Sequence, residues 1–148
     1  LMDCGGYALK LAQMLAGGNA EVSFAQMKYK DGIDADIFGS AVIRGVNTAH
    51  IEFGMDNSYK CSLEIWGSER SLLADRIFTA PAGFSPTVAY RDNNGEEVIR
   101  LPSDDTFAKS LDNFMLCITD DNKRVENYEA IQCQAELVEQ FKKKASEF

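Results

Sequence analysis

Histidine is nearly absent from this chain of 148 residues, which contains only His50. A single histidine cannot build the two-histidine motifs that hold catalytic zinc. The four cysteines, Cys4, Cys61, Cys117 and Cys133, are widely scattered and form no CxxC pair. We therefore expect no metal site and no disulfide framework, and we expect the cysteines to be reduced thiols in the core.

Basic residues are also scarce. The chain has 15 Lys and Arg against 23 Asp and Glu, which gives a formal net charge of -8. Sequence-independent binding of nucleic acid or of an anionic membrane requires clustered cations, so we expect neither partner. The only basic run, residues 142–144, lies in the last turns of a predicted helix, where cations complement the helix dipole.

Long hydrophobic runs and targeting signals are missing as well. No apolar run in the sequence approaches the roughly 20 residues of a membrane-spanning helix. Leu1 opens the chain without the charged region of a signal peptide, so a cytoplasmic location is expected by default. An opening that runs directly into a glycine turn is also typical of a piece cut from a longer protein.

Motifs for nucleotide binding and for self-contained catalysis are absent. The sequence has no GxGxxG, no P-loop and no GxSxG, so we expect no cofactor-binding residues and no complete catalytic set in this chain. His50 alternates to the polar side of a predicted strand, beside Glu52. It is predicted to be a polar-face residue and not a catalytic base, because no partner lies near it in the sequence.

The apolar content is sufficient for one ordinary core. With 45% hydrophobic and 26% charged residues, a chain of this length predicts a single domain. A first helix is predicted over residues 1–16 and is ended by Gly17 and Gly18. Its apolar stripe is predicted to consist of Tyr7, Leu11, Met14 and Leu15.

Strand-like segments follow the first helix. They are expected at residues 21–29, 37–46, 49–55, 59–66, 71–78, 88–90 and 98–101. Residues 49–55 and 59–66 alternate between apolar and polar side chains, which favours an antiparallel sheet with one face on a core and one polar face. Two hairpins are expected, one around residues 56–57 and one around residues 94–95.

The remainder of the chain is helical by pattern. One stripe follows a cap region at residues 103–105, and a second stripe lies further along. The first comprises Phe107, Leu111, Phe114, Met115 and Ile118, and the second comprises Tyr128, Ile131, Ala135, Val138 and Phe141. This element order predicts an α+β fold of two layers, with an open, predominantly antiparallel sheet and helices packed on one face. The irregular loop at residues 80–83 is explained as a surface connection at least as well as a lid.

The start of the first helix carries the most chemical information. Asp3 and Tyr7 lie one helical turn apart at a helix N-terminus, where the backbone potential favours anionic groups. Such a pair suits proton transfer to a sugar hydroxyl or carbonyl. A structural alternative stays open, in which Asp3 caps the helix and Tyr7 begins its apolar stripe.

The segment from Asp3 through Gly5 to Tyr7 resembles the Asp-x-Gly-x-His/Tyr motif of the substrate domain in the Gfo/Idh/MocA oxidoreductases. Residues 62–72 resemble that family's Leu-Glu-Ile strand and turn, and residues 107–118 resemble its Phe-x-x-x-Leu-x-x-Phe helix. The three segments stand in the family's order, and the likeness covers nearly the whole chain. Glu69 and Arg70 depart from the small residue and glycine that the family has in the strand turn.

The resemblance implies that residues 1–148 form a carboxy-terminal substrate-binding and oligomerisation domain, similar in fold to the carboxy-terminal domain of glyceraldehyde-3-phosphate dehydrogenase. It implies NAD or NADP as cofactor, held mainly by a Rossmann domain that this chain lacks. It also implies a sugar, sugar-nucleotide or polyol substrate, Tyr7 as acid/base and Asp3 as the carboxylate that orients the substrate. The free sheet face is expected to form a homo-oligomer, such as a dimer.

Two expectations about function follow. In the first, the chain belongs to an NAD(P)-dependent oxidoreductase and is inactive alone. Tyr7 in place of the motif's histidine resembles the sugar-nucleotide ketoreductase, glucose-fructose oxidoreductase and dihydrodiol dehydrogenase branches of the family, which leaves the substrate open. In the second, the chain is a non-catalytic binding or oligomerisation module that uses the exposed sheet face. The upstream reading frame separates them, because the enzyme requires a Rossmann glycine motif and a Glu-Lys-Pro sequence there.

Overall fold

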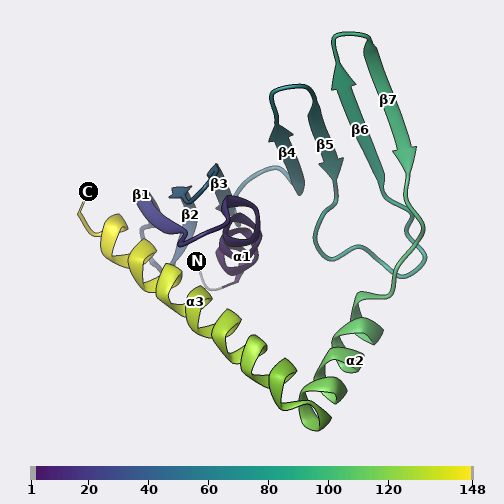
Figure 1. Cartoon of the computed structure of the whole chain (residues 1–148). Coiled ribbons are helices and arrows are strands. Elements are labelled where there is room, and N and C mark those ends of the chain that lie inside the picture. Colours follow the sequence, from purple (N-terminus) through teal and green to yellow (C-terminus); the bar gives the residue numbers. More distant parts are fainter. Residues whose placement is uncertain (1–2, 148) are drawn as a thin grey trace. The chain divides into compact units, whose positions relative to one another are not determined.

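The computed structural model describes residues 3–147, and these residues form three helices and seven strands (Figure 1). The helices are α1 (Cys4–Ala16), α2 (Thr106–Thr119) and α3 (Asp121–Ala145). The strands are β1 (Glu21–Lys30), β2 (Ile33–Arg44), β3 (Thr48–Gly54), β4 (Ser62–Trp66), β5 (Ser71–Asp75), β6 (Thr87–Asp92) and β7 (Gly95–Arg100). The predicted α+β class with antiparallel pairing is therefore confirmed.

The strands divide between two sheets, and the chain divides with them. One sheet has the order β1-β2-β3 and the other the order β4-β5-β6-β7. Residues 58–119 form one compact unit, and the described residues before and after them form the other. The single open sheet expected from the sequence is thus observed as two sheets in separate units.

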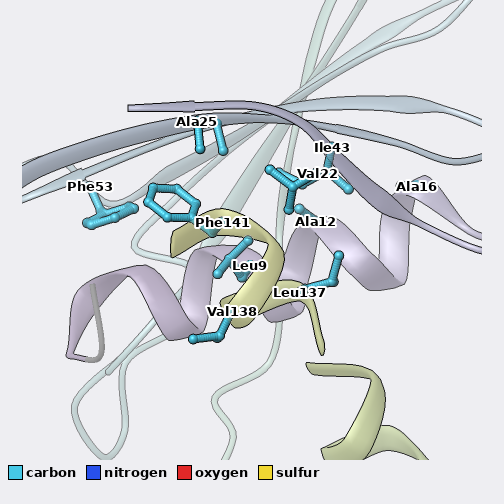
Figure 2. Close-up of a cluster of buried hydrophobic side chains, with 11 residues drawn as sticks. Leu9, Ala12, Ala16, Val22, Ala25, Ile43, Phe53, Leu137, Val138 and Phe141 are labelled. Atoms are coloured by element: carbon cyan, nitrogen blue, oxygen red, sulfur yellow. The ribbon is translucent and has the colours of Figure 1, made fainter. Parts of the chain in front are cut away.

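The first unit is a three-stranded antiparallel sheet with α1 and α3 against one face (Figure 2). Strand β2 is central, and Ala41 lies between Ala25 of β1 and Ile51 of β3. The rings of Phe53 and Phe141 pack with their centroids 5.7 Å apart, so β3 and α3 meet through aromatic contact. Gly39 makes room for this packing, since a Cβ there would lie 2.3 Å from the Phe53 ring.

Helix α1 buries a different stripe from the predicted one. Its buried residues are Gly5, Leu9, Ala12 and Ala16. Tyr7, Met14 and Leu15 are exposed, and Leu11 is half-buried, so the stripe expected from these four large side chains is wrong. Small residues on the buried side allow the helix backbone to approach the sheet closely. A search for a stripe of large apolar residues does not identify a face that is buried through its small residues.

The second unit is an antiparallel meander. The predicted hairpin around residues 94–95 is confirmed, because β6 pairs with β7 and Asp92 lies opposite Gly95. Strand β5 ends at Asp75, which is three residues before the predicted end at Phe78. It ends there because Arg76 has a positive φ of 53°, a conformation that no regular strand accommodates.

The predicted hairpin around residues 56–57 is wrong. Strand β3 pairs with β2 and strand β4 with β5, so the two segments lie in different sheets. The backbone N–H of Met55 donates to the carbonyl of Ile37 at 3.0 Å and extends the pairing with β2. Asn57 then packs against Gly54, where a Cβ would lie 2.1 Å from the Asn57 Oδ1 atom. Apolar alternation identifies the buried face of a strand but not its partner.

The two carboxy-terminal helices differ in burial. The predicted cap region before α2 is confirmed, since Asp105 accepts a hydrogen bond from the backbone N–H of Ala108 at 2.9 Å. None of the residues of α2 is buried, so its predicted apolar stripe is exposed. In α3, Val138 and Phe141 of the predicted stripe are buried together with Leu137, whereas Tyr128 and Ile131 are exposed.

The cysteine prediction holds in part. All four cysteines have free thiols, as expected. None is fully buried: Cys4 packs partly buried against the core, whereas Cys133 is exposed, so the predicted placement in the core is wrong for Cys133. Among residues 3–147, no group of histidine, cysteine and acidic side chains is arranged to hold a metal ion. No helix of the described chain is both long and apolar enough to cross a membrane.

Candidate functional site

The site predicted from the sequence lies at the first turn of α1. Asp3 occupies the N-cap position and Tyr7 follows in the helix. The carboxylate side chain is exposed, and the Tyr7 side chain is 55% exposed. Both groups are therefore accessible to a small molecule at one helix end.

The spacing of the motif explains why Tyr7 faces outward. Gly5 is buried on the core side of α1, on the same side as Leu9. Two residues along an α-helix correspond to a rotation of about 200°, so a residue two positions after Gly5 points away from the core. The glycine permits a close approach to the core, and the same spacing presents the Tyr7 phenol on the opposite side.

Neither structural role considered for the pair is observed. Asp3 sits at the N-cap, but its side chain accepts no capping hydrogen bond from the helix. Tyr7 is not part of the buried stripe. Asp3 is thus the N-cap residue without a side-chain capping bond, and Tyr7 lies outside the buried stripe of α1.

The helix that carries Tyr7 is held firmly. The Gln134 side chain of α3 donates to the carbonyl of Gly6 at 2.9 Å, one residue before Tyr7. Lys10 donates to the Ala130 carbonyl of α3 at 3.5 Å. At the other end of α1, the backbone N–H of Asn47 donates to the Ala16 carbonyl at 2.9 Å. A side chain on an anchored helix is better positioned for chemistry than one on a loop.

His50 lies on β3, where it is exposed and pairs across the sheet with Val42. This agrees with the prediction of a polar-face residue. The sheet and not the N-terminus of α1 determines where this side chain lies, so the structure gives no reason to add it to the site.

A second cluster lies within residues 58–119 and was not predicted. The guanidinium carbon of Arg76 lies over the rings of Tyr59 and Phe84, 5.8 Å from each ring centroid. The sequence pattern predicted regular strands at Tyr59 and Arg76 and a surface connection at residues 80–83. The irregular composition of that loop was the only signal in the sequence that this part of the chain departs from a sheet.

Comparison with known proteins places the chain near a group of sugar-nucleotide reductases. No model of a known protein family matches the chain. It is 32% identical over 142 residues to a dTDP-3,4-didehydro-2,6-dideoxy-alpha-D-glucose 3-reductase of Actinomadura kijaniata, covering 94% of this chain and 42% of the relative. It is 30% identical over 156 residues to a reductase of the same description from Streptomyces violaceoruber, covering 98% of this chain and 46% of the relative.

Solved structures give the same result. The chain matches a lysine-to-alanine variant of KijD10, a 3-ketoreductase from Actinomadura kijaniata in complex with TDP-benzene and NADP. The TM-score is 0.91 at 29% sequence identity, over 97% of this chain and 46% of that one. The fold therefore corresponds to the carboxy-terminal, glyceraldehyde-3-phosphate dehydrogenase-like part of such reductases. The chain spans less than half the length of the curated relatives that it matches.

Proposed function

We propose that the chain is the substrate-binding domain of an NAD(P)-dependent oxidoreductase of the Gfo/Idh/MocA type that reduces a keto group of a nucleotide-linked sugar. The proposal is supported by similarity, over almost the whole chain, to dTDP-sugar 3-reductases. It is carried by one observation on this chain: the exposed Tyr7 phenol on an anchored helix, beside an exposed carboxylate that caps nothing.

We expect no dinucleotide site among the described residues. Such a site requires a strand followed by a glycine turn and a helix whose N-terminus receives the pyrophosphate. Helix α2 does follow β7, but Asp104 and Asp105 precede it, and their negative charge opposes a pyrophosphate. NADP is bound in KijD10. For this protein, we assign the cofactor to a Rossmann domain outside the chain.

The chemistry assigned to this chain is binding and proton transfer. Reduction of a ketone leaves negative charge on the carbonyl oxygen, which must gain a proton to become a hydroxyl. The Tyr7 phenol donates that proton, and Asp3 accepts a hydrogen bond from a neighbouring sugar hydroxyl and so orients the ring. A tyrosine-to-phenylalanine variant of KijD10 has been solved with TDP-benzene and NADP.

The second candidate function is a binding or oligomerisation module without catalysis. It remains compatible with the exposed polar side chains His50 and Glu52 on β3. The proposed oxidoreductase also includes the sequence-based expectations of a cytoplasmic location and a homo-oligomer formed through that sheet face. A non-catalytic module has no need of an exposed phenol one helical turn from an exposed carboxylate, so we favour the enzyme.

The decisive experiment compares two proteins. The product of the complete reading frame should consume NADPH in the presence of a TDP-linked 3-ketosugar. The chain of 148 residues should neither consume NADPH nor bind it at micromolar concentration in calorimetry. Micromolar NADPH binding by the chain alone would contradict the assignment of the cofactor site. A complete protein that does not consume NADPH in the presence of a TDP-linked 3-ketosugar would favour the non-catalytic module.

A further inference from the structure

The Arg76 cluster lies in the second unit, residues 58–119. Its guanidinium group lies over two aromatic rings, those of Tyr59 and Phe84. Within the described part of the chain, Arg76 has no hydrogen bond and no ion pair, although Asp75 is its neighbour in sequence. In a protein of net charge -8, an arginine held in place without an anionic partner is a candidate binding group.

The backbone of the cluster is strained and fixed. Arg76 and Thr79 both have positive φ, 53° and 50°, in the left-handed region that costs a non-glycine residue about 1–2 kcal/mol. Hydrogen bonds to Cys61 hold the segment between them, because the backbone N–H of Ile77 donates to its carbonyl and that of Phe78 to its Sγ atom, both at 3.3 Å. Strain of this kind persists where the surrounding structure enforces it, and it concentrates at ligand-binding positions.

The same bonds explain how the rings are placed. Cys61 follows Tyr59 by two residues, so its contacts with residues 77–78 bring Tyr59 to the start of the Arg76 segment. Phe84 is placed by a turn in which its backbone N–H donates to the Pro81 carbonyl at 3.0 Å. Two separate segments thus present one aromatic ring each to a single guanidinium group.

Rings that stack on a guanidinium group do not occupy its N–H donors. Aromatic rings interact with a guanidinium group through its flat face, whereas its N–H donors lie in the plane and point outward. Those donors match the spacing of two oxygens on a phosphate and can bind them in a bidentate manner.

We propose that Arg76, held by the rings of Tyr59 and Phe84, binds the diphosphate group of a nucleoside-diphosphate ligand. The proposal deepens and rests on the proposed function, since a nucleotide-linked sugar carries a diphosphate between the nucleoside and the reacting ring. KijD10 was solved with TDP-benzene, a ligand of the same class.

Calorimetry of the full chain with thymidine diphosphate, and separately with inorganic pyrophosphate, tests the proposal. We expect the wild-type chain to bind thymidine diphosphate and Arg76→Met to weaken that affinity by at least about tenfold, the loss expected for a charge-assisted bidentate contact. Arg76→Lys should also weaken the affinity for thymidine diphosphate, because an ammonium group cannot bind two phosphate oxygens through a planar pair of N–H donors. Tyr59→Leu should cost about two- to fivefold through the lost cation–π contact.

Arg100→Met is the matched control, because Arg100 is an exposed arginine of the same unit at the end of β7. It removes the same charge and should change the affinity by less than about twofold, as expected for an exposed charge away from the ligand. Thermal unfolding of each variant checks that the second unit remains folded. Arg76 is exposed, so its replacement removes no core packing.

Three results would overturn the proposal: no binding of either probe to the wild-type chain, equal affinity in Arg76→Met, or an equal loss in Arg100→Met. Unchanged binding of thymidine diphosphate by Arg76→Met would exclude only the role of Arg76 and would not contradict the proposed function. Conversely, Arg76-dependent binding of pyrophosphate with no preference for thymidine diphosphate would support the anion site and count against a nucleotide-sugar substrate.

Discussion

At the scale of single residues, Tyr7 is the side chain whose role is easiest to test. Tyr7→Phe deletes only the phenolic oxygen, and the ring of this exposed residue contributes little to the core. In the complete enzyme we expect kcat to fall by about 10²–10⁴-fold, the usual contribution of a general acid or base. The free energy of unfolding should change by no more than about 0.5–1.5 kcal/mol, the contribution of one hydrogen bond.

The matched control is Tyr128→Phe, since Tyr128 is also an exposed helical tyrosine. It should leave kcat and the melting temperature nearly unchanged. If Tyr7→Phe kept more than about half of the wild-type kcat, far above the expected acid/base loss, the catalytic assignment of Tyr7 would be withdrawn.

The sequence pattern predicted Asp3 and Tyr7 as a candidate site but did not indicate Arg76, and the difference has a physical cause. The first pair is separated by one helical turn, so its proximity follows from local geometry alone. The Arg76 cluster depends on two positive φ angles and on bonds to Cys61 that no periodicity encodes. Sites assembled by irregular backbone are thus the ones that pattern analysis misses.

At the scale of elements, the choice of buried stripe on α1 gives a sharp prediction. Leu9 is fully buried and Met14 is 69% exposed. Leu9→Ala should lower the free energy of unfolding by about 2–5 kcal/mol, because it removes transfer energy and leaves a cavity. Met14→Ala should change it by less than about 0.5 kcal/mol, as exposed substitutions usually do.

Chemical denaturation of both variants measures the two values on the same scale. The stripe first predicted from the sequence included Met14 and omitted Leu9, so it gives the opposite order. A larger loss for Met14→Ala than for Leu9→Ala would mean that α1 does not pack as described.

For the strands, the sequence pattern predicted which face is buried better than which strands pair. The alternation in residues 49–53 correctly separated the buried Phe53 from the exposed His50 and Glu52. The two-residue turn before Gly95 correctly indicated a hairpin. Pairing between β3 and β2 was not predictable in the same way, because the partner of a strand is decided by distant packing and not by its own pattern.

At the scale of the whole molecule, self-association is the open prediction. The expected interface is the face of the first sheet that carries His50 and Glu52, opposite the helices. We expect sedimentation at tens of micromolar to show a species about twice the chain mass of 16.4 kDa, because two-fold dimers are the commonest closed assembly.

His50→Glu should weaken that association. It places a second carboxylate two residues from Glu52 on the proposed interface, and like charges brought together across a two-fold contact repel. Lys60→Glu, at an exposed residue of the other unit, is the control for the change in net charge. A wild-type chain that sediments only as a monomer would remove the support for this interface.

The division of the chain between its two units also determines which unit can finish folding first during synthesis. The second unit is continuous in sequence, from residue 58 to residue 119, whereas the core of the first needs Leu137, Val138 and Phe141 from the far side of that segment. A ribosome therefore releases every residue of the four-stranded meander before it releases the helix that covers Leu9. Until α3 emerges, the apolar face of the first sheet has only α1 against it, which makes this interval the one in which a chaperone would be most useful to the growing chain.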